Sequence, residues 1–171
     1  MAPKPETKRY GGLDLSLTSP GFAVVDVKNR RPSLVALSHV KTDSDEAQPL
    51  RYELIEAHAL LFFRQYRPDG GIAREIWPPS RNYELNDKVH GAWSAVDRAL
   101  ARLDLVVAAN LTPSNVKKRV TGNGTAKKPE VAAAVRRILR LSDDYKFATD
   151  DESDAAAVVL AYLIAEGLID V

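Results

Sequence analysis

The sequence predicts an α/β fold built on a mixed five-stranded sheet, three antiparallel strands followed by two parallel ones, with helices on both faces. Strand-like runs separated by short turns occupy residues 9–41. Beyond them, helical patterns alternate with two short apolar runs, as expected for strands joined by helical crossovers. The chain then ends in helical patterns rather than in further strands.

The first three strands are predicted by apolar runs. We expect strands over about residues 9–17, which contain "GLDLSL", and over residues 22–28, "FAVVDVK". "SLVALSHVK", residues 33–41, alternates between apolar and polar side chains. The turns "TSPG" and "NRRP" are too short for a crossover, so these strands form an antiparallel meander.

A helix and a fourth strand come next. Pro49 opens a helix that runs to about Tyr66, with its apolar positions largely on one face, and "PDGG" ends it. "IAREIW", residues 72–77, is a short strand that Pro78 and Pro79 cut off. In this topology, we expect that strand to pair beside the first one.

The second half of the chain completes the sheet and its helical cover. The predicted elements are a helix over 85–103, a fully apolar strand over 105–111, a short capped helix over 112–120, the loop "TGNGTAKK", and helices over 129–141 and about 152–166. This order is the ribonuclease H-like arrangement. We expect a flexible tail over residues 1–8 and a single ribonuclease H-like domain over residues 9–171.

Composition narrows the class of protein. The 171 residues are 45% hydrophobic and 27% charged, as in globular proteins, and none is cysteine, which excludes disulfides and thiolate chemistry. The start, "MAPKPETKRY", lacks the apolar core of a signal peptide, and the run "AAAVVLAYLIA" is too short to span a bilayer. We expect a cytoplasmic protein without a membrane partner.

Four carboxylates stand in otherwise apolar settings. Asp14 lies between Leu13 and Leu15, and Glu75 lies within the fourth strand. Asp151 and Asp154 have the i, i+3 spacing that places both on one face of a helix. Taken singly, Asp151 could cap its helix and Glu75 could face water. Buried together, the four would repel one another unless cations lay among them.

Oxygen ligands without histidine favour Mg²⁺, with Mn²⁺ able to substitute, over zinc. Two such ions stabilise both the attacking and the leaving oxygen in phosphodiester hydrolysis. The sequence therefore predicts a two-metal phosphodiesterase site. The histidines His39, His58 and His90 are scattered, and we assign them no catalytic role.

A basic block lies before the acidic end of the chain. Between Ser114 and Arg140, eight Lys or Arg residues face Glu130 alone among acidic residues. The loop "TGNGTAKK" allows backbone amides to approach a phosphate closely, and Lys127 and Lys128 add charge. The alternative is a solvated surface loop before a helix. The surrounding basic excess disfavours that alternative for the loop. On charge alone, the basic block and the acidic block that follows it are better explained as two solvated faces that partly neutralise each other.

Four segments resemble the RuvC family of Holliday-junction resolvases. "GLDLSLTSPGFAVV" is similar to the family's first catalytic strand, and "IAREIW" to its strand with a catalytic Glu. "VKKRVTGNGTAKKPEV" resembles its DNA-binding segment, and "DDESDAAAVVLAY" its terminal Asp-x-x-Asp helix. The compact, divergent chain suits a phage-type member.

The resemblance implies an enzyme that resolves Holliday junctions and other branched DNA by paired nicks, as a homodimer, with branch-migration proteins as further partners. It implies that the metal-binding catalytic residues are Asp14, Glu75, Asp151 and Asp154, and that Lys117 and Lys128 act near the scissile phosphate. The DNA-binding residues that we expect are Lys117, Lys118, Arg119, Lys127, Lys128, Trp77 and Arg81.

One departure from the family concerns the aromatic residue that stacks into the junction centre. Trp77 stands a residue earlier than the pattern, and Tyr83 is a second candidate. An ordinary core or rim tryptophan is the alternative for Trp77.

Two other functions compete. A ribonuclease H-type hybrid nuclease would share the fold, and a catalytically inactive junction-binding protein would share the basic segment. The glycine–lysine segment argues against the first, and the complete set of four carboxylates argues against the second.

Overall fold

The computed structural model describes residues 6–171, and most of the expected N-terminal tail lies outside the described residues. Five strands form one sheet in the order β3-β2-β1-β4-β5. Strands β1 (Lys8–Asp14), β2 (Gly21–Lys28) and β3 (Arg31–His39) are antiparallel, whereas β4 (Gly71–Glu75) runs parallel to β1 and β5 (Val107–Leu111) parallel to β4. The predicted mixed sheet, with the fourth strand beside the first, is confirmed.

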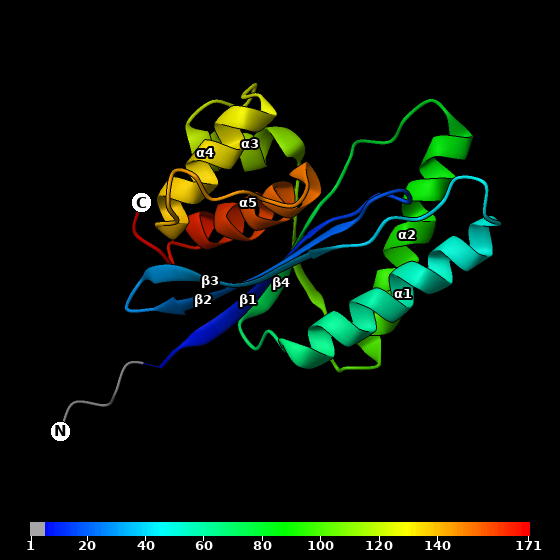
Figure 1. Cartoon of the computed structure of the whole chain (residues 1–171), viewed down its shortest axis with the longest axis horizontal. Coiled ribbons are helices and arrows are strands. Elements are labelled where there is room, and N and C mark those ends of the chain that lie inside the picture. Colours follow the sequence, from blue (N-terminus) through cyan, green and yellow to red (C-terminus); the bar gives the residue numbers. More distant parts are fainter. Residues whose placement is uncertain (1–5) are drawn as a thin grey trace.

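Helices cover both faces of the sheet (Figure 1). On one face lie α1 (Gln48–Gln65) and α2 (Tyr83–Ala101). On the other lies α5 (Asp150–Ala165), with α3 (Pro113–Thr121) and α4 (Lys128–Leu139) packed on it. Each face has its own apolar cluster, so the sheet separates two cores.

Local sequence explains most of the element ends. The β2–β3 turn places Asn29 and Arg30 at φ 51° and 62°, the left-handed pair of a tight hairpin whose twist matches that of the strands. Thr112 caps α3, since its side chain accepts a hydrogen bond from the amide of Asn115. Gly122 ends α3 at φ 83°, a conformation that glycine adopts without strain.

Two expectations need correction. The first strand begins at Lys8, within the expected tail, and ends at Asp14 rather than near Leu17, because the turn into β2 starts there. The apolar run before Leu111 forms a shorter strand, Val107–Leu111, in which Ala108 and Asn110 are exposed. That strand lies at the edge of the sheet.

Over residues 6–171, every helix is too short or too polar to cross a membrane.

Candidate active site

Two carboxylates lie side by side where parallel strands end. Asp14 is the last residue of β1, and Glu75 is the last residue of β4. The strands are in register with Leu13 opposite Arg74, so Asp14 and Glu75 are the next neighbouring pair. Residues in register on adjacent strands point to the same face of a sheet. Both side chains therefore face the layer of α5.

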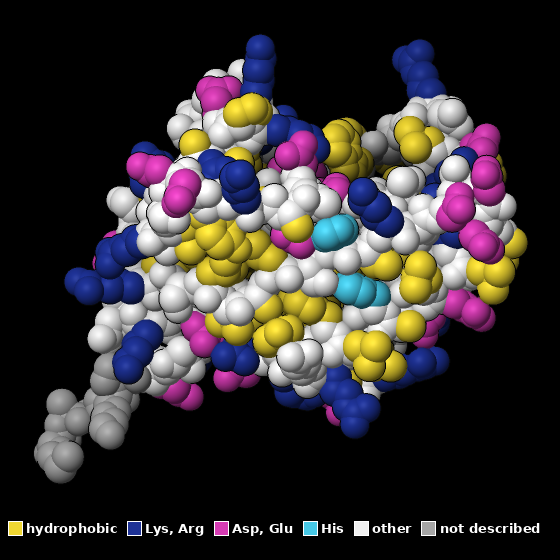
Figure 2. All heavy atoms as spheres, in the orientation of Figure 1, with side chains coloured by type: hydrophobic (Ala, Val, Ile, Leu, Met, Phe, Trp, Pro, Cys, Tyr) yellow, Lys and Arg dark blue, Asp and Glu magenta, His cyan; other side chains and the backbone are white. Residues whose placement is uncertain are grey.

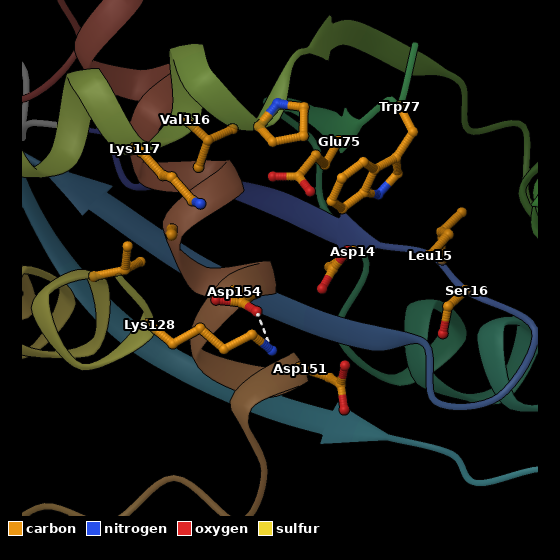
Figure 3. A pocket seen from close by; sticks show the side chains of 13 residues that line it. Asp14, Leu15, Ser16, Glu75, Trp77, Val116, Lys117, Lys128, Asp151 and Asp154 are labelled. Carbon is orange, nitrogen blue, oxygen red and sulfur yellow. Dashed lines mark ion pairs between the residues drawn. The ribbon is translucent and has the colours of Figure 1, made fainter. Parts of the chain in front are cut away.

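The other two carboxylates come from the start of α5. Asp151 and Asp154 stand on the face of its first turns that looks toward the ends of β1 and β4 (Figure 3). Ser19, in the β1–β2 turn, donates a 2.7 Å hydrogen bond from Oγ to Oδ2 of Asp151. Asp151 thus uses its side chain in the site rather than as a cap, and the cap position of α5 is Thr149.

One cavity of about 240 Å³ collects these groups. Figure 3 shows the four carboxylates and two lysines pointing into it, with the indole of Trp77 above Asp14. The residues that line it are Asp14, Leu15, Ser16, Glu75, Trp77, Pro113, Val116, Lys117, Lys128, Val131, Asp151, Asp154 and Ala157. The three segments that carry the carboxylates therefore converge on one pocket, as the sequence predicts.

Burial and mutual repulsion raise the pKa of three of these acids, Asp14, Glu75 and Asp154. Burial, followed by the charges of Glu75 and Asp154, raises the pKa of Asp14 well above its usual value. Burial and Asp154 raise the pKa of Glu75 to about 7. The pKa of Asp154 is also raised by burial, which outweighs the opposing effect of Lys128. Added positive charge in the pocket would lower all three pKa values again.

Lys128 provides part of that charge. Its ammonium Nζ lies 3.3 Å from Oδ2 of Asp154 and 3.6 Å from Oδ2 of Asp150. Burial acts to lower the pKa of Lys128, but Asp154 and its acidic neighbours raise it, and the net pKa is raised. Lys117, on α3, lies on the side of Glu75 and acts to lower the pKa of that carboxyl. Both lysines therefore belong to the pocket.

The donor set fits a hard divalent cation in chemistry, because four carboxylates face one cavity. The carboxylates do not form a complete coordination site as they stand, because within residues 6–171 no three acidic or histidine side chains are close enough to hold one ion. Lys128 occupies space between the carboxylates at the start of α5, so it contributes cationic charge that a metal would otherwise supply.

The remaining residues expected to bind DNA lie around the cavity. Trp77 is 56% exposed, which excludes a core position, and lines the rim. Tyr83, at the start of α2, is 84% exposed. Lys118 and Arg119 line a separate shallow depression, and Lys127 and Arg81 are exposed on the loops before α4 and α2, respectively.

The surface above the carboxylate cavity is hollowed (Figure 2). Figure 2 shows Lys and Arg side chains projecting from both rims of a hollow between the α3–α4 layer and the tip of α2, with apolar side chains between them. Such a surface suits a polyanion lying across the carboxylate pocket, because the rims attract phosphates while the apolar floor can contact bases.

Sequence reasoning missed three polar residues next to the carboxylates. Ser19 binds Asp151, and Ser16 lines the cavity. The third, Glu152, is almost fully buried and contacts His39 at the end of β3. The "LTSPG" turn directly after Asp14 was the available signal for the serines, whereas nothing local indicates a contact between residues that are 113 positions apart.

Comparison with known proteins agrees with the fold and the position of the pocket. The family model described as "Crossover junction endodeoxyribonuclease RuvC" matches residues 11–162. Proteins of that name from Salinispora arenicola and Paenarthrobacter aurescens are 33% and 36% identical to this chain. Each alignment covers 91% of the chain, and 87% and 81% of those relatives, respectively.

Solved structures of RuvC proteins are also similar to this chain. The structure of Thermus thermophilus RuvC superposes with a TM-score of 0.80 at 31% identity, covering 94% of this chain and 96% of that one. The same protein "in complex with Holliday junction substrate" gives a TM-score of 0.81 at 32% identity, covering 93% and 94%. The yeast mitochondrial Holliday junction resolvase Ydc2, at 12% identity and a TM-score of 0.67, shares the fold.

The sheet order, the helical layers and the meeting of β1, β4 and α5 define the ribonuclease H-like class of α/β nucleases. Within that class, the chain belongs to the RuvC family of crossover junction endodeoxyribonucleases. The resemblance seen in the sequence motifs is thereby confirmed.

Proposed function

We propose that this protein is a metal-dependent endonuclease that resolves four-way DNA junctions and related branched DNA by phosphodiester hydrolysis. The observation that carries the proposal is the convergence of Asp14, Glu75, Asp151 and Asp154 on one cavity rimmed by basic side chains. A relative whose chain aligns over nearly its full length is solved in complex with a Holliday junction substrate, which supports the choice of DNA substrate.

Nucleases of the RuvC family are metal-dependent, and we assign the four carboxylates as the ligands in this chain. We further propose Mg²⁺ as the ion, Mn²⁺ as a substitute and two ions per site, because all four donors are hard oxygens. Bound ions would supply positive charge for both the attacking and the leaving oxygen of the scissile phosphodiester. The protein's part is to hold the ligands at the ends of three rigid elements.

The basic residues divide into two groups by position. Lys117 and Lys128 reach into the pocket, so we assign them to the scissile phosphate and its developing charge. Lys118, Arg119, Lys127 and Arg81 are exposed outside the carboxylate cluster, so we assign them to backbone phosphates farther along the DNA arms. We assign Trp77 to stacking at the junction centre, since its indole stands exposed above Asp14.

Paired nicking of a four-way junction needs two active sites, so we propose that a homodimer performs the reaction in the cytoplasm, alongside branch-migration proteins. The pockets of two copies would then address opposed strands. A two-fold symmetric dimer would present two copies of the pocket.

The decisive experiment is a cleavage assay with Asp14→Asn. The change removes one ligand and lowers negative charge beside the phosphate, so cleavage should fall below detection while junction binding is retained or tightened. Substrates should be a labelled four-way junction, a linear duplex and an RNA–DNA hybrid, each with Mg²⁺ or a chelator.

Asp143→Asn is the matched control, because this exposed carboxylate lies outside the pocket and its loss should leave cleavage unchanged. Preferential cleavage of the hybrid would instead identify a ribonuclease H. Binding without any metal-dependent nicking would identify an inactive junction-binding protein. Near-wild-type nicking by Asp14→Asn would overturn the four-carboxylate assignment.

A further inference from the structure

The start of α5 carries a concentration of negative charge. Asp150, Asp151, Glu152 and Asp154 fall within five consecutive residues. Over residues 6–171, the side chain of the cap residue Thr149 makes no capping hydrogen bond, and its hydroxyl is buried without a partner. The helix dipole favours acids at this end, but like charges this close repel one another, and the side chain of the cap residue does not hold the first turn. The position of this turn therefore depends on contacts from elsewhere in the fold.

Glu152 makes the first of these contacts. Its Oε1 lies 2.8 Å from Nδ1 of His39, and its Oε2 accepts a 3.1 Å hydrogen bond from the amide of Ala148. The side chain is only 10% exposed, and that of His39 is 26% exposed. Both oxygens of this buried carboxylate are therefore used within the protein, one toward the sheet and one toward the segment that leads into α5.

The same turn also contacts the start of β2. Gly21 pairs with His39 across the β2–β3 ladder, so the two contacts originate from opposite residues of one register pair. A side chain at Gly21 would collide with the carbonyl oxygen of Asp151, so the strand and the helix touch through their backbones. Ser19, two residues earlier, holds the carboxylate of Asp151 at 2.7 Å.

We propose that His39 and Glu152 form a positioning pair that fixes the first turn of α5 on the sheet, and thereby sets the separation of Asp151 and Asp154 from Asp14 and Glu75. The pair stands beside the cavity rather than in it: Glu152 follows Asp151 directly but turns toward β3. The inference rests on the proposed metal-dependent nuclease function. Groups that orient metal ligands characteristically change metal affinity when they are removed.

Metal binding is the readout that a merely structural contact would not move. We would measure Mn²⁺ binding to the intact protein by calorimetry, the Mn²⁺ dependence of junction cleavage, metal-free junction binding and the melting temperature. His39→Ala and Glu152→Ala should each weaken Mn²⁺ binding about tenfold and raise the Mn²⁺ concentration for half-maximal cleavage about as much. Metal-free junction binding should be unchanged, and Glu152→Gln, which keeps a hydrogen-bonding side chain, should recover most of the loss.

His58→Ala is the matched control. His58 makes the equivalent contact with Ser38, the neighbour of His39 on β3, at 2.9 Å, but on the α1 face of the sheet. This control should lower the melting temperature without altering Mn²⁺ affinity. His39→Phe preserves ring volume while removing the hydrogen bond, so it provides the test if His39→Ala does not fold, and the same tenfold weakening is expected.

Wild-type Mn²⁺ affinity in His39→Phe and Glu152→Ala would overturn the positioning role. So would an equal loss of affinity in His58→Ala, since the effect would then be general loosening. A wild-type protein that binds Mn²⁺ but never cleaves a junction would overturn the proposed function instead, and the calorimetric comparison would still decide the role of the pair.

Discussion

The two helical layers pack on the same sheet in different ways. On the side of α1 and α2, Phe22, Phe62 and Phe63 fill the core, with ring centroids 5.3–6.1 Å apart. On the side of α5, small residues dominate, and Ala155–Ala161 is entirely buried. There, Gly12 of β1 faces the helix so closely that any side chain would overlap the carbonyl oxygen of Ala155.

The difference matters because the carboxylates bridge the sheet and the layer of α5. Large side chains can adjust their rotamers and so let a helix shift slightly over a sheet. Backbone against backbone leaves no such freedom. The carboxylates of β1, β4 and α5 meet on the side where sheet and helix touch through their backbones.

Gly12→Ala should produce the largest effect and would break this arrangement directly. The added methyl group collides with the backbone of α5, so we expect a loss of about 3 kcal/mol or more of unfolding free energy, measured by chemical denaturation. Gly91→Ala, in the α2 layer, is the matched comparison. Its methyl group meets only the ring end of Tyr52, which can swing away, and alanine favours helix by about 1 kcal/mol. Equal losses in both variants would contradict the distinction between the layers.

The pH dependence of stability should come from the carboxylates facing α5. The pKa of Glu75 is about 7 in the folded protein, above its ordinary value of 4.5, so the native state binds more protons between these values. Without metal, the contribution of Glu75 to stability should therefore be fully present below about pH 4.5 and be lost as the pH rises through 7, with Asp14 acting in the same direction.

Glu75→Gln removes this penalty. In a chelator it should be more stable than wild type by about 2–3 kcal/mol at pH 8 and by little at pH 4.5. Adding Mn²⁺ at pH 8 should stabilise the wild type more than the variant. Glu53→Gln, on the exposed side of α1, is the control: its stability relative to wild type should be the same at pH 4.5 and at pH 8. A pH-independent difference between Glu75→Gln and wild type would argue against buried, mutually repelling acids.

Trp77→Ala tests the segment that connects the site to the α2 layer. Its indole is 56% exposed, so truncation should leave the melting temperature nearly unchanged. A lost stacking contact worth about 1–3 kcal/mol should slow cleavage of an intact junction about tenfold. A pre-nicked junction, whose strands already move freely, should be much less affected. Tyr83→Ala distinguishes the second candidate. Equal slowing on both substrates would end the stacking role.

Substitution of the lysines should give the smallest effect. It would test the division between basic residues that reach into the pocket and those exposed outside it. Lys117→Ala and Lys128→Ala should each reduce the salt slope of junction binding by about one unit, and should slow cleavage more than they weaken binding. Lys118→Ala, from the outer face of α3, should reduce the slope similarly while cleavage of bound junction continues at the wild-type rate. Unchanged binding and rate in the Lys117/Lys128 double variant would make the segment solvated surface.

Sequence patterns predicted the order of elements and the convergence of four carboxylates on one cavity. Alternating and continuous apolar runs identified the five strands of the described sheet, because each strand packs apolar side chains at least partly against a helical layer. The i, i+3 spacing of Asp151 and Asp154 was sufficient to place them on one helical face. Local patterns failed at strand ends. Nothing in "DLSL" indicates that pairing stops at Asp14, because the turn into β2 decides it.

The apolar segment before Leu111 shows the same limit. Hydrophobicity alone predicted a strand there but carried no information on its place in the sheet, and edge placement leaves alternate residues exposed. His39 shows it more clearly still. A scattered histidine had no assignable role until folding brought it against Glu152.

The sequence by itself determined which residue types are available for the candidate site, namely four carboxylates and a glycine–lysine loop. It also determined the ribonuclease H-like order of strands, which brings the first and fourth strands together. What only the tertiary structure decided was which groups contact which, including the lysine between the carboxylates and the pair that holds α5. The physical reason is range. Periodicity and turn chemistry act over a few residues, whereas burial, repulsion and ion pairing depend on distances in space between residues remote in sequence.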